Sequence, residues 1–150
     1  MNYYSYDIVF QEVPGEISLC FTITGCKLQC NNCHSSYLWD SKNGTELTII
    51  NYLELLNKYN GYISCILFMG GEWEPEELIK FLKIAEENNL KTCLYTGEDY
   101  ISDDIKKHLT FLKTGKYTKE FGGLDNKNTN QKFMIVSSDT DITHVFNNGI

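Results

Sequence analysis

Short apolar runs alternate along the chain with stretches in which apolar residues recur every three or four positions. Cys65–Met69 is apolar at every position, which is typical of a parallel strand covered on both faces. Pro14 and Gly15 form a turn pair between the first two runs. Together the runs predict strands over Asp7–Gln11, Glu16–Thr24, Cys65–Met69, Lys91–Tyr95, Phe111–Thr114 and Lys132–Val136.

Helices are expected between these strands. Thr48 and Ser102 are N-cap candidates, because their hydroxyls can accept a hydrogen bond from the first turn of a helix. Pro75 suits the first turn of another helix. The predicted helices cover Thr48–Lys58, a segment from Pro75 with a buried stripe of Leu78, Leu82 and Ala85, and Asp103–Leu109.

Length and composition indicate one domain. The chain has 150 residues, of which 42% are hydrophobic and 13% aromatic, enough for one well-filled core and too few for two. Successive strand-helix units form parallel sheets covered by helices, and a chain this short completes only part of a barrel. The predicted fold class is therefore α/β, a partial parallel β/α barrel, in a single domain over residues 1–150.

Charge and hydropathy exclude several classes of partner. The formal net charge is −7, without a cluster of Lys or Arg, which argues against binding to nucleic acid. No apolar stretch approaches the ~20 residues that cross a bilayer. Met1–Asp7 has neither the basic residues nor the apolar core of an export signal. We therefore expect a cytoplasmic protein that binds neither nucleic acid nor a membrane.

Three of the six cysteines lie together directly after the second predicted strand. Cys26, Cys30 and Cys33 have the spacing C-x3-C-x2-C, so their thiolates can converge on one soft metal centre. A closed zinc site or an ordinary cluster would need a fourth ligand, whereas three cysteines on a [4Fe-4S] cubane leave one iron open. The spacing therefore predicts a cluster whose open iron binds a small molecule.

The same loop has three other interpretations. Cys30–His34 also matches the C-x-x-C-H pattern of c-type haem attachment, which belongs outside the cytoplasm. A Cys3His zinc site with His34 is disfavoured, because the adjacent Cys33 and His34 do not easily point at one tetrahedral ion. A disulfide is disfavoured because cytosolic thiols stay reduced.

The other cysteines and histidines are expected to be structural. Cys20, Cys65 and Cys93 lie singly inside apolar runs and are interpreted as buried core residues. His108, on a predicted helix, and His144, near the end of the chain, are interpreted as ordinary surface residues.

Two further short motifs follow predicted strands. In parallel sheets, ligands bind beyond the carboxyl ends of the strands, where Gly70-Gly71-Glu72 and Thr96-Gly97 fall. Adjacent glycines allow a ligand to approach the backbone, and Glu72 offers an acceptor for a ligand ammonium group. Taken alone, the Gly-Gly-Glu sequence would be a plain tight turn, but its place beside the cysteine loop favours a binding role.

These motifs resemble those of the radical S-adenosylmethionine (SAM) enzymes, which carry a C-x3-C-x2-C loop after the first barrel strand and a Gly-Gly-Glu motif after the second. The chain further resembles the activating proteins of anaerobic ribonucleoside-triphosphate reductases. That resemblance covers Glu16–Leu19, Cys33–Leu38, Phe68–Glu72, Tyr95–Gly97, Leu112–Tyr117, Gly122–Asp125 and Thr129–Phe133.

The chain departs from the family pattern at three places. Asn32 occupies the position before the third cysteine, where many relatives have an aromatic residue beside the adenine. Trp73 replaces the proline that often follows Gly-Gly-Glu, and Val13–Ser18 lacks the arginine of the corresponding segment.

The resemblance implies a radical mechanism with two cofactors, a [4Fe-4S] cluster and SAM. Cleavage of SAM would give a 5′-deoxyadenosyl radical that removes a hydrogen atom from a glycine of the large reductase subunit. No side chain need act as acid or base, so no catalytic residue is expected. The implied partners are that subunit and an electron donor such as flavodoxin or ferredoxin. The implied metal ligands are Cys26, Cys30 and Cys33, and the implied SAM-binding residues are Asn32, Cys33, His34, Gly70, Gly71, Glu72, Thr96 and Gly97.

Other functions stay open on the sequence. The chain could activate a different glycyl-radical enzyme, act on a small molecule as another radical SAM enzyme, or be a non-catalytic iron-sulfur or zinc protein. The polar stretch Gly115–Gln131 is long for a connection in so compact a domain. We expect it to dock the reductase, with a tolerated surface insertion as the alternative.

Overall fold

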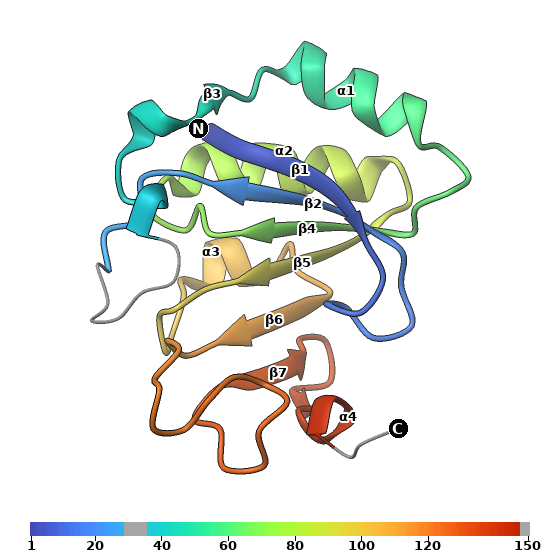
Figure 1. Ribbon diagram of the computed structural model, residues 1–150. Helices are drawn as coiled ribbons and strands as arrows, with labels where there is room; N and C mark the ends of the chain where they lie inside the picture. Colours follow the sequence, from blue (N-terminus) through green and yellow to red (C-terminus); the bar gives the residue numbers. More distant parts are fainter. Residues whose placement is uncertain (29–35, 148–150) are drawn as a thin grey trace.

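The computed structural model describes residues 1–28 and 36–147, and this part of the chain forms one eight-stranded sheet with the order β3-β1-β2-β4-β5-β6-β7-β8 (Figure 1). The strands are β1 (Asn2–Val9), β2 (Ser18–Ile23), β3 (Thr45–Glu46), β4 (Cys65–Met69), β5 (Lys91–Tyr95), β6 (Phe111–Thr114), β7 (Lys132–Ile135) and β8 (Thr140–Asp141). The helices are α1 (Ile49–Lys58), α2 (Pro75–Glu87), α3 (Asp103–Lys106) and α4 (His144–Asn147), with short 3-10 turns at Ser36–Leu38 and Ser41–Asn43.

The middle of the sheet is the expected partial β/α barrel. Strands β2, β4, β5 and β6 are parallel, and their arrowheads point the same way in Figure 1. Antiparallel pairing extends the sheet at both edges, through β1 and β3 on one side and β7 and β8 on the other. The sheet direction reverses where strands are joined without a crossover helix, as β1 and β2 are.

The predicted element boundaries are confirmed at some ends and wrong at others. Strands β4, β5 and β6 have the predicted bounds. The first strand begins at Asn2 instead of Asp7 and ends at Val9, because its Tyr-rich start pairs with both β2 and β3. The third helix ends at Lys106 instead of Leu109.

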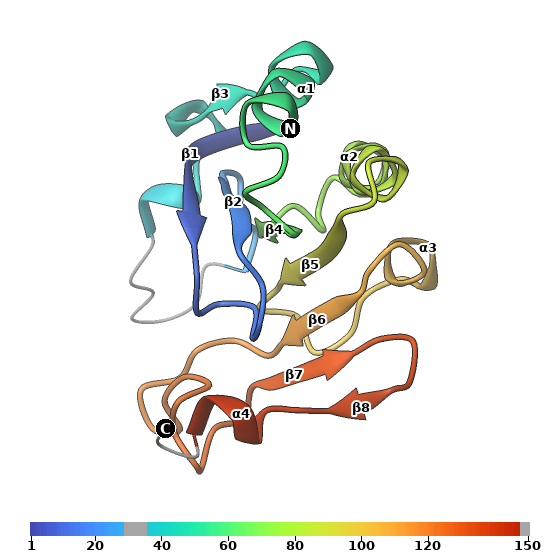
Figure 2. The same ribbon diagram turned by 90° about the vertical axis from the view of Figure 1, so that its right-hand side faces the viewer.

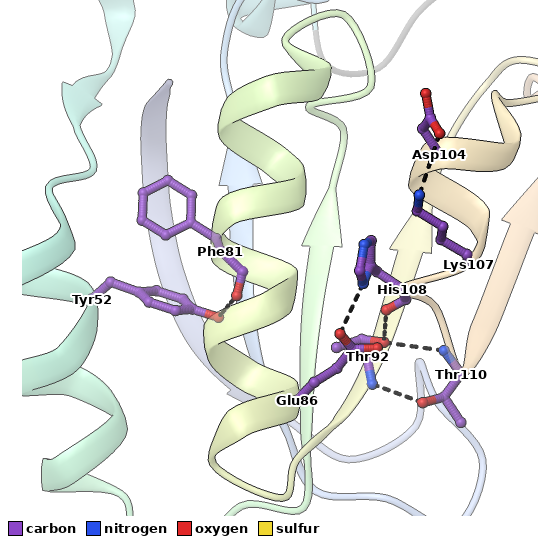
Figure 3. A network of polar contacts seen from close by, with 8 residues as sticks. All are labelled: Tyr52, Phe81, Glu86, Thr92, Asp104, Lys107, His108 and Thr110. Carbon is purple, nitrogen blue, oxygen red and sulfur yellow. Dashed lines mark hydrogen bonds and ion pairs between the residues drawn. The ribbon is translucent and has the colours of Figure 1, made fainter.

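Helices α1, α2 and α3 lie on one side of the curved sheet (Figure 2). The buried side chains of α2 are Leu78, Phe81, Leu82 and Ala85, which confirms the predicted stripe. Thr48 and Ser102 cap α1 and α3 through their hydroxyls, as expected. The Tyr52 hydroxyl of α1 donates to the Phe81 carbonyl oxygen at 2.9 Å and ties α1 to α2 (Figure 3).

The opposite, concave face of the sheet is filled by a second apolar cluster. Its buried members are Val13, Cys20, Cys65, Leu67, Cys93, Phe111 and Phe133, and Phe146 of α4 packs against them. Burial raises the pKa of the Cys20 and Cys65 thiols to about 12 and that of Cys93 well above its usual value. These thiols therefore stay protonated at neutral pH, and the prediction that they are core residues is confirmed.

The environment of His108 differs from the predicted one. Its side chain is only 17% exposed, and Nδ1 lies 2.9 Å from Oε2 of Glu86 on α2. Its carbonyl oxygen accepts a hydrogen bond of 2.6 Å from the Thr92 hydroxyl (Figure 3). His108 is thus a structural contact between α2, β5 and the end of α3, whereas His144 is exposed as expected.

Among the helices of the described residues, none combines the length and the apolar character that a membrane span requires.

Candidate functional site

The carboxyl ends of the parallel strands bring the predicted motifs to one edge of the sheet. The segment after β2 leads to Cys26, and Leu28 from this segment contacts the end of β5. A Cβ atom at Gly97 would lie only 2.5 Å from Leu28 Cδ1. The start of the cysteine loop therefore packs against Gly97, as the strand-end argument predicts.

Backbone hydrogen bonds fix the position of Cys26. The amides of Gly25 and Cys26 both donate to the carbonyl oxygen of Leu38, at 2.6 and 3.2 Å. The buried Thr24 hydroxyl donates to the carbonyl oxygens of Asn2 at 3.1 Å and Ser41 at 3.2 Å. Leu38 and Ser41, which follow the cysteine loop, thus fix the position of residues 24–26, which precede it.

The other predicted ligands lie outside the described residues. This applies to Cys30 and Cys33 and also to Asn32 and His34, so their roles stay predictions. Within residues 1–28 and 36–147, no group of three or more His, Cys, Asp or Glu side chains is placed to hold a metal ion. The described part contains only Cys26 of the predicted triad.

A cavity of about 760 Å³ opens beside Cys26. Its lining residues are Gly25, Cys26, Lys27, Trp39, Asp40, Ser41, Trp73 and Glu74. The indole Nε1 atoms of Trp39 and Trp73 are buried and find no hydrogen-bond partner in the described part of the chain. The cavity thus combines a cysteine with unused buried donors, a set that suits a sulfur-rich metal group.

Glu72 and Thr96 come together at the ends of β4 and β5, as predicted. The Thr96 hydroxyl donates to Oε1 of Glu72 at 2.6 Å, and the amide of Glu98 donates to the same hydroxyl at 3.0 Å. Glu72 Oε2 is buried without a hydrogen-bond partner among the residues described. A buried carboxylate oxygen left over in this way is suited to a ligand ammonium group.

Burial raises the pKa of the Glu72 carboxyl group above its usual value, and the hydrogen bond from Thr96 opposes part of that rise. The nearby Lys113 charge also favours the ionised form. Glu72 therefore pays a desolvation penalty that a cationic ligand would offset.

The two glycines before Glu72 are required by the turn itself. Gly70 and Gly71 have φ angles of +90° and +111°, which side chains rarely adopt. A Cβ atom would lie 2.6 Å from the ring of Trp73 at Gly70 and 3.0 Å from the sulfur of Met1 at Gly71. The space beside each glycine is thus filled by the protein, and their contact with a ligand stays a prediction.

Lys113 is a residue of this edge that the sequence interpretation missed. It lies on β6 with 8% exposure, and its Nζ donates to the carbonyl oxygens of Gly115 at 2.7 Å and Thr96 at 3.3 Å. Gln131 Nε2 also donates to Gly115, at 3.2 Å. The available signal was a single lysine inside the apolar run Phe111–Thr114.

Replacing Lys113 with methionine is expected to lower the free energy of unfolding by about 1.5–3 kcal/mol, since two carbonyl oxygens lose a charged donor. Urea unfolding of the cluster-free protein measures this. The exposed Lys119 is the matched control, and its change to methionine should have little effect. Equal stability of the Lys113→Met variant and the parent would show that these hydrogen bonds are not needed.

Comparison with known proteins identifies the family of this chain. A family model described as a 4Fe-4S single cluster domain matches residues 14–135, a range that includes Cys26, Cys30 and Cys33. The pyruvate formate-lyase-activating enzyme of Clostridium pasteurianum is 34% identical over 103 residues, which cover 63% of this chain and 43% of that protein. The match thus spans less than half of that relative. The family match supports an iron-sulfur cluster as the metal group, and because it extends over most of the sequence, the chain belongs to the 4Fe-4S single cluster domain family.

Proposed function

We propose that this protein is a radical SAM activating enzyme that generates a glycyl radical on anaerobic ribonucleoside-triphosphate reductase. The observation that carries the proposal is the buried Glu72 oxygen, which lacks a partner among the described residues and lies at the edge where the cysteine loop begins. A carboxylate in this place suits the ammonium group of SAM. The similarity to a pyruvate formate-lyase-activating enzyme supports the same class of reaction.

The residues proposed for the site have the donor chemistry that both cofactors require. Cys26 would hold the cluster together with Cys30 and Cys33, and Glu72 would hold the SAM ammonium. Bound cluster and SAM would together supply a one-electron cleavage of SAM into methionine and a 5′-deoxyadenosyl radical, which would take a hydrogen atom from a glycine of the partner. Asn32, Cys33 and His34 would line the adenosine.

The protein's own contribution is binding and orientation. Thr96 holds Glu72 by a hydrogen bond of 2.6 Å, and Lys113 holds the Thr96 carbonyl oxygen at 3.3 Å. The concave face below is closed by apolar side chains, including Phe133. This packing keeps bulk water from the underside of the site, which protects a radical from side reactions. No described histidine is needed for the reaction.

The proposal also names which glycyl-radical enzyme this protein activates. The segments Leu112–Tyr117, Gly122–Asp125 and Thr129–Phe133 resemble those of the reductase-activating proteins and support the reductase. A different glycyl-radical enzyme is the second candidate, supported by the 34% identity to a pyruvate formate-lyase-activating enzyme. Flavodoxin or ferredoxin would donate the electron.

Anaerobic reconstitution tests both levels of the proposal. The protein is loaded with iron and sulfide, then given SAM and dithionite, and 5′-deoxyadenosine is measured. If no 5′-deoxyadenosine forms, the protein is a non-catalytic iron-sulfur or zinc protein. The loaded protein is next mixed with the large reductase subunit or with pyruvate formate-lyase, and electron paramagnetic resonance detects the glycyl radical. A radical on pyruvate formate-lyase alone would favour the second candidate. SAM cleavage with a radical on neither protein would indicate a radical SAM enzyme that acts on a small molecule.

The loop over 115–131 is the proposed docking element for the reductase. Its own hydrogen bonds support it, including Asn130 Nδ2 to the Lys116 carbonyl oxygen at 3.1 Å and the Gly122 amide to the Thr118 carbonyl oxygen at 2.8 Å. Such a loop presents a defined surface, on which Tyr117 and Phe121 are 42% and 41% exposed.

Changing Tyr117 to alanine is expected to reduce radical formation on the reductase at least several-fold while SAM cleavage without the partner persists, because an exposed aromatic anchor is lost. Glycyl-radical yield and 5′-deoxyadenosine are measured on the same samples. The control is Tyr62→Ala, which removes a 75% exposed tyrosine before the amino end of β4. An unchanged radical yield in the Tyr117 variant would make the loop a plain insertion.

A further inference from the structure

The only two tryptophans of the chain, Trp39 and Trp73, line the same cavity as Cys26. They come from different parts of the sequence. Trp39 follows the cysteine loop, and Trp73 follows the turn after β4. Neither residue belongs to the motifs that carry the proposed function, and their joint position beside one cysteine calls for a physical explanation.

Trp73 bridges the turn after β4 and the cysteine loop. Its ring lies so close to Gly70 that a Cβ atom there would be 2.6 Å from Cη2. At the other end, Nε1 would be 3.1 Å from a Cβ atom at Gly25, the residue before Cys26. Glycine at both positions makes room for the indole, whose N–H group therefore lies against the start of the cysteine loop.

Trp39 is held next to the same cysteine. The residue before it, Leu38, accepts the amide hydrogens of both Gly25 and Cys26. Trp39 is thus one residue from the carbonyl group that fixes Cys26. Its Nε1 atom, like that of Trp73, is buried and has no hydrogen-bond partner in residues 1–28 and 36–147.

A buried indole N–H group without an acceptor is costly. The indole nitrogen is a donor only, and leaving it unpaired costs about 1–3 kcal/mol. The carboxylates that line the cavity have other contacts. Asp40 Oδ1 accepts the Lys42 amide at 2.9 Å, and Glu74 Oε1 lies 3.7 Å from the amino terminus. The sulfur atoms of a cluster on Cys26 would bring acceptors to this place.

We propose that Trp39 and Trp73 donate their indole N–H groups to sulfur atoms at the Cys26 side of the cluster, and that these bonds raise its reduction potential. Hydrogen bonds to thiolate or sulfide favour the reduced, more negatively charged cluster, so each N–H makes reduction easier. This proposal rests on the cluster of the proposed function and assigns the two tryptophans a role as positioning and tuning residues.

Substitution by phenylalanine tests this, because it removes the N–H group and keeps an aromatic ring. We expect Trp39→Phe and Trp73→Phe each to lower the reduction potential of the reconstituted cluster, and the double variant to lower it further. Redox titration followed by electron paramagnetic resonance measures the shift, and iron content shows that the cluster is loaded. The control Tyr52→Phe removes a buried donor from the α1-α2 interface and should leave the potential unchanged.

Nuclear magnetic resonance gives a readout that does not depend on electron transfer. The chain has two indole N–H signals, and each is assigned by its loss in one variant. Loading the cluster should shift or broaden both strongly. Potentials equal to that of the parent in both single variants, or indole signals unaffected by loading, would overturn the proposal. Failure of the parent to assemble a cluster or to cleave SAM would instead contradict the proposed function.

Discussion

Replacing Cys26, Cys30 or Cys33 with alanine is expected to abolish SAM cleavage and to remove most of the bound iron. Each of these cysteines would supply one of three thiolates, and the fourth iron would have no cysteine ligand. No other thiolate of the motif could therefore replace a lost one. Loss of one ligand therefore leaves two irons incompletely held. Iron and sulfide content and the yield of 5′-deoxyadenosine after anaerobic reconstitution measure the effect.

The matched controls are the other three cysteines. Cys20, Cys65 and Cys93 are buried on the concave face, with thiol pKa values raised by burial, so they should not compete for iron. Their alanine variants should keep the cluster and cleave SAM, with a loss of about 1–3 kcal/mol in stability from the smaller side chain. Full activity of a Cys30→Ala variant, or loss of iron in Cys93→Ala, would contradict the assignment of ligands.

Glu72→Gln is expected to weaken SAM binding about 10- to 150-fold and to leave the cluster in place. The substitution keeps the shape and the hydrogen bond from Thr96, but removes the charge that the ammonium group would meet. A hydrogen bond between charged groups contributes about 1.5–3 kcal/mol, which corresponds to that range of affinity. Equilibrium binding of SAM to the reconstituted protein measures it. Glu98→Gln, which removes an exposed carboxylate near Glu72, is the control.

The same variant should make the cluster-free protein more stable at neutral pH. Burial raises the pKa of Glu72, so the folded state holds its proton more tightly than the unfolded state does. The resulting penalty is absent below the unfolded pKa of about 4 and grows as the pH rises through the higher folded pKa. The stability difference between Glu72→Gln and the parent should therefore increase with pH.

Binding should show the opposite dependence on pH. The parent should lose affinity for SAM as the pH falls through the raised pKa of Glu72, whereas the glutamine variant should lack this transition. Denaturant unfolding and SAM binding over a common pH series measure both effects. Equal affinities in parent and variant at neutral pH would return Gly70-Gly71-Glu72 to the role of a plain turn.

Local sequence patterns were sufficient for most of the elements. The apolar run Cys65–Met69 has the predicted bounds, and Thr48 and Ser102 cap the helices that their hydroxyls predicted. These features depend on neighbouring residues, so their causes lie within a few positions of the chain. The first strand was misplaced because its extent depends on pairing with β2 and β3, which lie far along the chain.

The candidate site also has features that the sequence predicted and features that depend on contacts between distant segments. The cysteine spacing and the motifs at the strand ends were visible in the sequence, and the meeting of Glu72 with Thr96 followed from the rule that parallel strands end at one edge. Lys113 was missed because nothing in the sequence around a lysine in an apolar run indicates which groups will accept its hydrogen bonds. Its two carbonyl acceptors are defined only once β5 and β6 lie side by side.

The order of residues alone determined the class of fold, the cysteine motif and the strand ends that carry the site, because apolar periodicity, caps and short spacings act over a few residues. Only the tertiary structure decided that the outer strands run antiparallel, that Glu72 keeps a buried oxygen unpartnered among the described residues, and that Trp39 and Trp73 flank Cys26. Burial and hydrogen-bond satisfaction depend on contacts between distant segments, and these exist only after the sheet has formed.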